Sequence, residues 1–153
     1  MAIVYIGIGS NMGDKRANCL RAVGLMSSSG IVVTKKSSLY ETEPWGLNEQ
    51  PLFMNMAAVA ETDLPPERLL AALKDIEKKM GRLETARWGP RCIDLDILFY
   101  DNGIFTENDL CIPHPLLHQR EFVLLPLSEI APDKWHPVLK KTVRQLREEL
   151  HNV

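Results

Sequence analysis

The chain has 153 residues, of which 45% are hydrophobic and 25% are charged, and this composition is typical of one ordinary globular domain spanning residues 1–153. Its 18 basic and 20 acidic side chains give a formal net charge of -2, which argues against nucleic acid or an anionic membrane as a partner. The 3 cysteines form no CxxC pair, which argues against a disulfide framework and favours a reducing cytoplasm, and no apolar run approaches the roughly 18–20 residues that span a bilayer.

The hydrophobic pattern predicts strands and helices separated by polar segments. In chain order the predicted elements are a strand at 3–8, a helix at 14–26, strands at 31–40 and 52–62, a helix at 64–80, a strand at 92–100, a short strand pair near 104–112, a helical piece after Pro115 and a C-terminal helix at about 138–150. The first segment, IVYIGI, is β-branched and aromatic, which indicates a strand rather than the basic start of a signal peptide. Two polar segments, 41–51 and 82–91, predict long loops, and such loops are often functional.

The order of these elements is βαββαβ followed by a C-terminal extension, which predicts an α+β fold of the ferredoxin-like type. In that arrangement an antiparallel sheet is covered by helices on one face. We expect the βαββαβ part and the extension to share one hydrophobic core.

Glycines 7, 9 and 13 follow the first predicted strand and suggest a dinucleotide-binding turn. The third glycine comes one residue late for G-x-G-x-x-G, and the neighbouring antiparallel strands also argue against a Rossmann-type oxidoreductase. A tight turn between strand and helix is the alternative interpretation. The sequence contains no G-x-x-x-x-G-K-[ST], which excludes a P-loop enzyme.

Asp94 and Asp96 form the sharpest chemical signal in the chain. On a strand, positions i and i+2 point to the same face, so the two carboxylates project together while Ile93, Leu95 and Ile97 face the core. Two carboxylates this close repel each other unless a cation lies between them, and oxygen ligands favour Mg²⁺ or Ca²⁺. The alternative is an ordinary alternating strand with a solvated polar face.

A basic loop precedes the two aspartates and carries Arg82, Arg87 and Arg91 around Trp88. Arginines bind phosphate oxygens through bidentate hydrogen bonds. Cations placed before paired carboxylates therefore predict a metal–polyphosphate site. The alternative is that these arginines pair with the aspartates directly.

His114 and His118 are four residues apart, a spacing that suits a metal on a helix face. No third ligand is placed as in H-E-x-x-H, and the flanking prolines put His114 at the start of the helix. We therefore favour His114 and Arg120 as phosphate or nucleotide contacts and interpret His118 as a surface residue.

Asn55 lies inside an otherwise apolar strand, where its amide must find hydrogen-bond partners. It could serve a ligand with a donor–acceptor edge, or it could be satisfied by a neighbouring loop. Trp45, Phe53 and Phe122 could stack on a planar ring, although each could equally pack in the core.

Several segments together resemble a known family. They are G-x-G-S-N at 7–11, YETEPWG at 40–46, Q-P-x-F-x-N at 50–55, R-W-G-P-R-x-x-D-x-D-I at 87–97 and P-H-P at 113–115. In this order they are similar to 6-hydroxymethyl-7,8-dihydropterin pyrophosphokinases of folate biosynthesis, and the similarity extends over nearly the whole chain. The resemblance implies transfer of pyrophosphate from ATP to the pterin hydroxymethyl group, with release of AMP.

The resemblance also implies roles for individual residues. It implies that Asp94 and Asp96 bind two Mg²⁺ ions and that Arg82 and Arg91 neutralise phosphate charge. The implied ATP contacts are Lys74, Glu77, Arg87, Trp88, Arg91, Ile97, His114 and Arg120. The implied pterin pocket consists of Thr42, Pro44, Trp45, Phe53, Asn55, Asp94 and Phe122.

A ferredoxin-like fold can also recognise RNA, so an RNA-binding module is the remaining rival. Such a module would need aromatic side chains on the open sheet face in an RNP-like motif, and the sequence has none. We expect ATP and the pterin as the partners, and no obligate protein partner.

Overall fold

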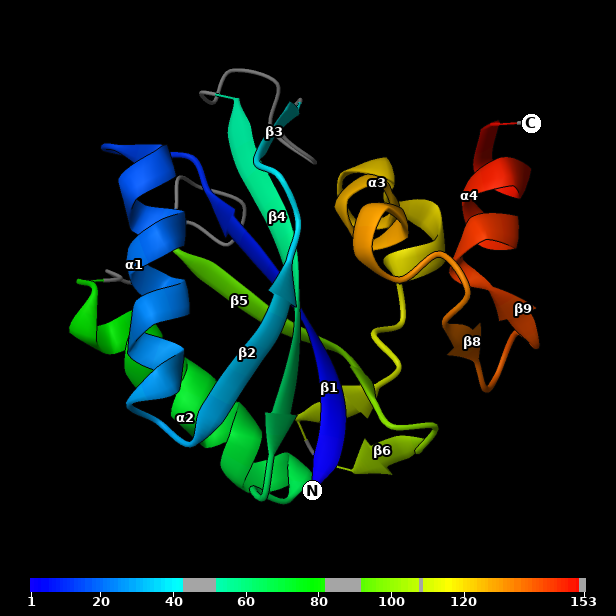
Figure 1. The fold of residues 1–153 in the computed structure, drawn as a ribbon, viewed down its shortest axis with the longest axis horizontal. Coiled ribbons are helices and arrows are strands. Elements are labelled where there is room, and N and C mark those ends of the chain that lie inside the picture. Colours follow the sequence, from blue (N-terminus) through cyan, green and yellow to red (C-terminus); the bar gives the residue numbers. More distant parts are fainter. Residues whose placement is uncertain (43–51, 82–91, 108, 152–153) are drawn as a thin grey trace.

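A computed structural model describes residues 1–42, 52–81, 92–107 and 109–151 (Figure 1). The strands are β1 (Ala2–Ser10), β2 (Ile31–Lys36), β3 (Tyr40–Thr42), β4 (Phe53–Thr62), β5 (Asp94–Tyr100), β6 (Phe105–Glu107), β7 (Leu110–Ile112), β8 (Trp135–His136) and β9 (Lys141–Thr142). The helices are α1 (Lys15–Ser27), α2 (Pro66–Lys79), α3 (Glu121–Ile130) and α4 (Val143–His151), with a short 3-10 helix, η1, at Leu117–Gln119.

The main sheet is antiparallel with the order β2-β4-β1-β5, and β3 also pairs with β4. The strand β1 therefore lies in the centre, between β4 and β5. Helices α1 and α2 connect the strands on one side of this sheet. The predicted α+β fold, a βαββαβ antiparallel sheet with a C-terminal extension, is confirmed.

The two crossover helices begin and end at the residues that favour these positions. The Asp14 carboxylate accepts a hydrogen bond from the backbone N–H of Ala17, which caps the first turn of α1. Helix α2 begins with a proline in its first turn and carries two lysines in its last turn. Gly81 follows α2 with a positive φ of 79°, a conformation that favours glycine.

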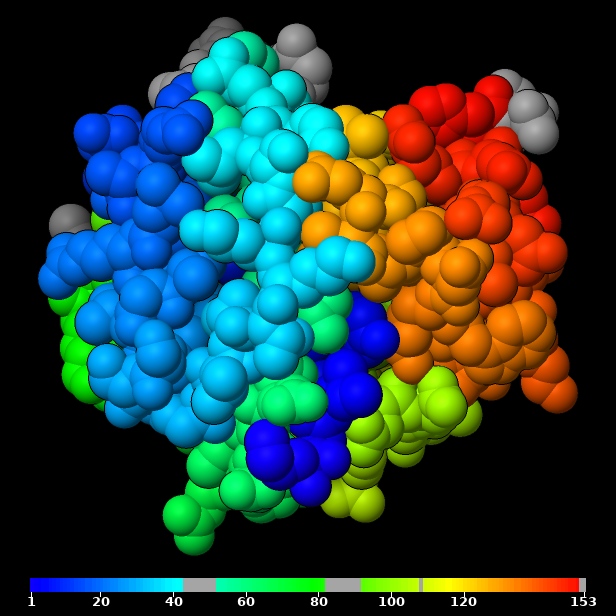
Figure 2. All heavy atoms as spheres, viewed as in Figure 1, coloured from blue at the N-terminus to red at the C-terminus, as the bar shows by residue number. Residues whose placement is uncertain are grey.

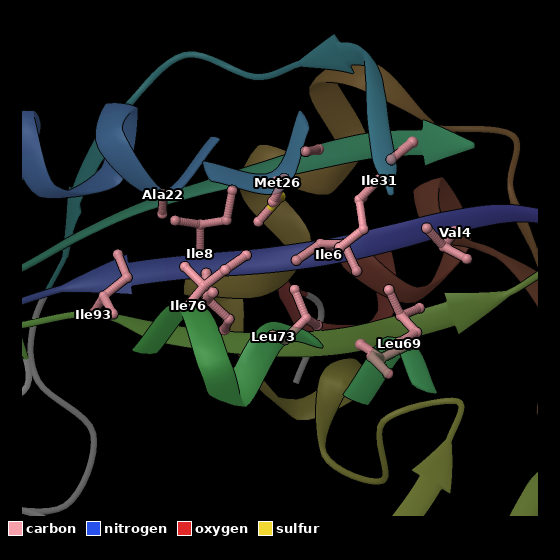
Figure 3. Close-up of a cluster of buried hydrophobic side chains, with 14 of the residues drawn as sticks. Val4, Ile6, Ile8, Ala22, Met26, Ile31, Leu69, Leu73, Ile76 and Ile93 are labelled. Atoms are coloured by element: carbon pink, nitrogen blue, oxygen red, sulfur yellow. The ribbon is translucent and has the colours of Figure 1, made fainter. Parts of the chain in front are cut away.

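The first hydrophobic core lies between the sheet and helices α1 and α2. Figure 3 shows side chains from β1, α1, β2 and α2 meeting there, together with Ile93 just before β5. Leu95 and Ile97 of β5 belong to the same core as Ile93, so Asp94 and Asp96, which alternate with these three residues, point to the opposite face.

A second core on the opposite face corrects two of our expectations. Leu98 and Phe99 of β5 and Ala57 of β4 are buried there against α3 and α4. In Figure 1 the sheet separates the α1–α2 pair from the α3–α4 pair. Helices therefore cover both faces, not one, and the C-terminal extension has a core of its own because its apolar residues pack on the face that α1 and α2 leave open.

Several boundaries also differ from the sequence pattern. The strand predicted at 31–40 is two strands, because Ser37 exchanges hydrogen bonds with the backbone of Ala57 and interrupts the ladder. The strand predicted at 3–8 extends to Ser10, and the one predicted at 92–100 begins at Asp94.

The C-terminal helix begins at Val143, not near 138, because the preceding residues form the β8–β9 hairpin. Thr142 and Gln145 cap this helix reciprocally, since each side chain accepts a hydrogen bond from the other's backbone N–H. In the part of the chain that the structure describes, no helix is both long and apolar enough to cross a membrane.

Candidate active site

Polar side chains of two strands, β4 and β5, lie on either side of a glycine of β1 in one row across the sheet. Asn55 of β4 lies opposite Gly9 of β1, and Gly9 lies opposite Asp94 of β5. In the next row, Gly7 lies opposite Asp96. Residues directly opposite each other on antiparallel strands point to the same face, so the Asn55 amide and both carboxylates share the face on which α3 packs.

Gly9, in the central strand β1, leaves the space that the Asn55 side chain occupies. A Cβ atom at Gly9 would lie 2.9 Å from Asn55 Oδ1, which is closer than Cβ atoms approach other heavy atoms in proteins. The Asn55 amide therefore occupies the space that a side chain at position 9 of β1 would need. Asn55 is only 6% exposed, and its Nδ2 donates to Thr42 Oγ1 at 2.6 Å. Its partner is thus a side chain of the adjacent strand β3, not the loop backbone that we considered as the alternative.

Phe53 lies two residues before Asn55 and points to the same face, opposite Thr42. It is half-buried, as is Phe122 at the start of α3. The Arg120 guanidinium lies over the Phe122 ring, 5.5 Å from its centroid. The two phenylalanines therefore come from opposite layers, one from the sheet and one from the C-terminal extension.

The extension also brings a cation to the two aspartates. Burial lowers the pKa of Arg120, and the charges of Asp96 and Asp94 oppose that shift, which places the guanidinium within electrostatic reach of both carboxylates. The sequence had suggested that loop arginines would supply this charge. Arg120, from the segment before α3, provides part of it in the described structure.

His114 is a neutral side chain at ordinary pH. Burial, and secondarily the charge of Arg120, lowers its pKa from 6.5 to about 4. Its Nδ1 accepts a hydrogen bond from the backbone N–H of Leu116 at 3.2 Å, so the neutral ring carries its proton on Nε2. His114 can therefore offer a phosphate one N–H donor but no charge.

This lowered pKa predicts a pH-dependent stability. Between pH 6.5 and about 4 the unfolded chain binds more protons at His114 than the folded chain, so stability falls as the pH falls through this window, by up to about 3 kcal/mol. We expect His114→Asn, whose Oδ1 can still accept from Leu116, to show a flatter dependence of the unfolding free energy on pH. Urea unfolding at several pH values measures it.

His118→Asn is the matched control for this measurement, because His118 lies only four residues away and its ring contacts the Gln119 side chain. It should leave the contribution of His114 to the pH dependence in place. Equal slopes in wild type and His114→Asn would contradict the buried, neutral state of His114.

Three other residues implied as ATP contacts lie outside the row of aspartates. Glu77 of α2 is only 5% exposed. Its carboxylate accepts a hydrogen bond at 2.9 Å from the backbone N–H of Leu95, the residue between the two aspartates. The Ile97 side chain is buried in the first core, on the opposite face from the aspartates, and Lys74 is exposed on α2. If Ile97 contacts a ligand beside the aspartates, it does so through its backbone, because β5 is an edge strand of the sheet and the Ile97 side chain is buried.

The remaining predicted site residues lie outside the described residues. They are Pro44, Trp45, Arg82, Arg87, Trp88 and Arg91. A zinc site at His114 and His118 gains no support, because no cluster of three or more His, Cys, Asp or Glu side chains that could hold a metal ion occurs within residues 1–42, 52–81, 92–107 and 109–151.

The family model of 7,8-dihydro-6-hydroxymethylpterin-pyrophosphokinase matches residues 5–132 of this chain. The chain belongs to this family. One relative is the 2-amino-4-hydroxy-6-hydroxymethyldihydropteridine pyrophosphokinase of Aquifex aeolicus. It is 40% identical over 97% of this chain and 92% of its own length. A relative of the same name from Methylorubrum extorquens is 44% identical over 87% of this chain and 85% of its own length.

Other relatives are much longer proteins. The Dictyostelium discoideum folic acid synthesis protein FOL1 is 45% identical over 98% of this chain, which spans 23% of that protein. A solved structure of Plasmodium falciparum HPPK-DHPS has a TM-score of 0.78 and 19% identity, and covers 99% of this chain and 44% of its own. At that identity the likeness supports the fold alone.

Proposed function

We propose that this chain transfers pyrophosphate from ATP to the hydroxymethyl group of 6-hydroxymethyl-7,8-dihydropterin, forming the pterin diphosphate and AMP in folate biosynthesis. The observation that carries the proposal is the row of Asn55, Gly9 and Asp94 across three strands. It puts a group that can recognise a pterin edge beside a group that can hold a metal–phosphate complex. One domain, residues 1–153, carries both.

The donor set at Asp94 and Asp96 fits Mg²⁺. Both ligands are carboxylates, the hard oxygen donors that Mg²⁺ prefers, and Mg²⁺ commonly takes its remaining ligands from substrate phosphates and water. When bound, Mg²⁺ neutralises charge on the polyphosphate and orients it. We propose that the two aspartates hold two such ions.

The ATP side of the site lies along β5 and the segment before α3. Arg120 offers a charged donor beside the aspartates, and His114 offers a neutral one. From the motif resemblance we add Lys74, Glu77, Arg87, Trp88 and the backbone of Ile97 to this proposed set. We assign charge neutralisation in the transition state to Arg82 and Arg91.

The pterin side lies on β3, β4 and the start of α3. Phe53 and Phe122 provide the two faces that stack on the flat bicycle, and Thr42 and Asn55 provide the polar edge. From the motif resemblance we also assign Pro44 and Trp45 to this proposed pocket.

The reaction then depends chiefly on the alignment of the two substrates and on neutralisation of the phosphate charge. The pterin hydroxyl oxygen attacks the β-phosphorus of ATP, its bond to that phosphorus forms as the bond to the α-phosphate oxygen breaks, and AMP leaves. Because the transition state is loose, in-line alignment and neutralisation supply most of the catalysis, and a strong general base is not required. The segments 41–51 and 82–91 can exclude water, whose attack on ATP is the competing reaction.

Product analysis tests this proposal directly. The purified chain is incubated with ATP and Mg²⁺, with and without the 6-hydroxymethyl pterin, and nucleotides are separated by chromatography. We expect AMP in amounts equal to the pterin diphosphate, and only when the pterin is present. Formation of ADP in place of AMP, or AMP release independent of the pterin, would refute the assignment.

We also propose that the protein works in the cytoplasm. All three cysteines, Cys19, Cys92 and Cys111, are free thiols, as is usual in a reducing compartment.

A further inference from the structure

A carboxylate of the C-terminal extension binds the short segment that leads into the pterin side of the site. Glu129 of α3 accepts three kinds of hydrogen bond: from the backbone N–H of Ser38 at 3.0 and 3.1 Å, from Ser38 Oγ at 3.2 Å, and from Tyr40 Oη at 2.5 Å. In Figure 2 the segment around β3, drawn in cyan, lies against the orange surface of α3. One side chain thus connects α3 to the middle of the segment between β2 and β3 and to the first residue of β3.

Besides its contact with Glu129, β3 is held by its pairing with β4, by the hydrogen bond between Thr42 and Asn55, and by an ion pair of 3.5 Å between Glu41 and Lys15. Strand β3 is only 3 residues long and pairs with β4 alone, off the main order of the sheet. The ladder along β4 is interrupted at Ser37, between its pairing with β2 and its pairing with β3, so the register of β3 does not follow from that of β2. A short edge strand with one neighbour is weakly held by its backbone hydrogen bonds alone, so an anchor outside the sheet has a large influence on it.

The position of β3 determines how Asn55 is presented. Tyr40 lies directly opposite Asn55, and Thr42, two residues later on the same face, accepts the hydrogen bond from Asn55 Nδ2. The Asn55 oxygen is meanwhile confined above Gly9. Contacts from Glu129 through Tyr40 and Thr42 to Asn55 are therefore continuous, and a shift of β3 would turn or release the amide.

The ionisation of these groups is consistent with a tight contact. The hydrogen bond from Tyr40 lowers the pKa of Glu129, and the same hydrogen bond raises the pKa of Tyr40. The carboxylate is therefore charged at neutral pH, and hydrogen bonds to a charged acceptor are stronger than neutral ones.

We infer that Glu129 is a positioning residue for pterin recognition: it holds β3 so that Thr42 orients the Asn55 amide toward the substrate edge. The inference rests on the proposed function for the identity of the substrate. It does not rest on that function for the contacts themselves, since these exist in the protein without a ligand. Glu129 touches neither substrate in this scheme and acts only through β3.

The test compares Glu129→Ala, Glu129→Gln and Tyr40→Phe in the full chain. Misplacing a recognition group by about 1 Å can cost up to about 100-fold, so we expect Glu129→Ala to raise the KM for the pterin about tenfold. The KM for ATP should stay within about twofold of wild type. Glu129→Gln keeps one acceptor oxygen and should recover most of the loss, and Tyr40→Phe should show an intermediate effect.

Glu149→Gln is the matched control, because Glu149 is also a helical surface glutamate with a single strong contact, to Lys141. It should leave both KM values unchanged. Equal rises of both KM values in Glu129→Ala, or an unchanged pterin KM in a folded Glu129→Ala protein, would overturn the inference.

A second readout does not depend on activity. The side-chain amide of Asn55 gives its own pair of nuclear magnetic resonance signals, assigned from Asn55→Ala, in protein without ligand. We expect Glu129→Ala and Tyr40→Phe to shift these signals and Glu149→Gln to leave them in place. If the wild-type chain makes no AMP, the proposed function fails, and unshifted amide signals in Glu129→Ala separately refute the positioning role.

Discussion

Asp94→Asn and Asp96→Asn should each lower kcat/KM by about a thousandfold or more, because the loss of metal-assisted charge stabilisation costs several kcal/mol and each 1.36 kcal/mol is tenfold in rate. Both variants keep the shape of the side chain, remove its charge and replace one acceptor oxygen with an NH2 donor. Removing one of two adjacent carboxylates also relieves their repulsion, so the fold should persist. Steady-state AMP formation across a range of Mg²⁺ concentrations measures the effect.

Asp133→Asn provides the matched control for the aspartate variants. Asp133 is exposed and pairs with Arg144, away from the site. It should keep wild-type activity and the wild-type Mg²⁺ dependence. Substantial Mg²⁺-dependent turnover in either site variant would remove that aspartate from the metal site, whereas loss of thermal unfolding cooperativity would show a structural role instead.

Asn55→Ala should weaken pterin binding about 5- to 150-fold, since leaving a buried polar partner unmatched costs about 1–3 kcal/mol. The effect should be confined to the pterin, because Asn55 lies on β4 while the proposed ATP contacts lie along β5 and before α3. Phe122→Ala should also weaken pterin binding, through lost stacking, and Phe53→Tyr should be tolerated because it keeps the ring face. Calorimetric titration with the pterin, and separately with a non-hydrolysable ATP analogue, measures both affinities.

Asn102→Ala is the control for this series. Asn102 follows β5 at the end opposite Asp94, and its side-chain oxygen accepts a hydrogen bond from Lys134. Neither affinity should change in this variant. Unchanged pterin affinity in both Asn55→Ala and Phe122→Ala would place the pterin pocket elsewhere.

Local rules in the sequence were enough for most of the main sheet. The alternation of Ile93, Leu95 and Ile97 with two aspartates predicts which face of β5 is polar, because strand side chains alternate strictly. The cap at Asp14 and the glycine at the end of α2 mark the helix boundaries by backbone preferences that act within a few residues. The Thr142–Gln145 capping box was also present in the sequence and would have placed the start of α4 correctly.

Tertiary structure alone decided how these pieces meet. Asn55, Gly9 and Asp94 form one row because of the strand register, which arises from pairings between residues 46 and 85 positions apart. That α3 and α4 cover the second face depends on the apolar area left open by α1 and α2, a property of the assembled sheet. The sequence by itself thus determined the residue types, the periodicity and the motifs of a pyrophosphokinase, because these are set by neighbours along the chain. The approach of Arg120 to the aspartates and of Glu129 to β3 was decided only in the folded molecule, because contacts between distant segments exist only once the layers have packed.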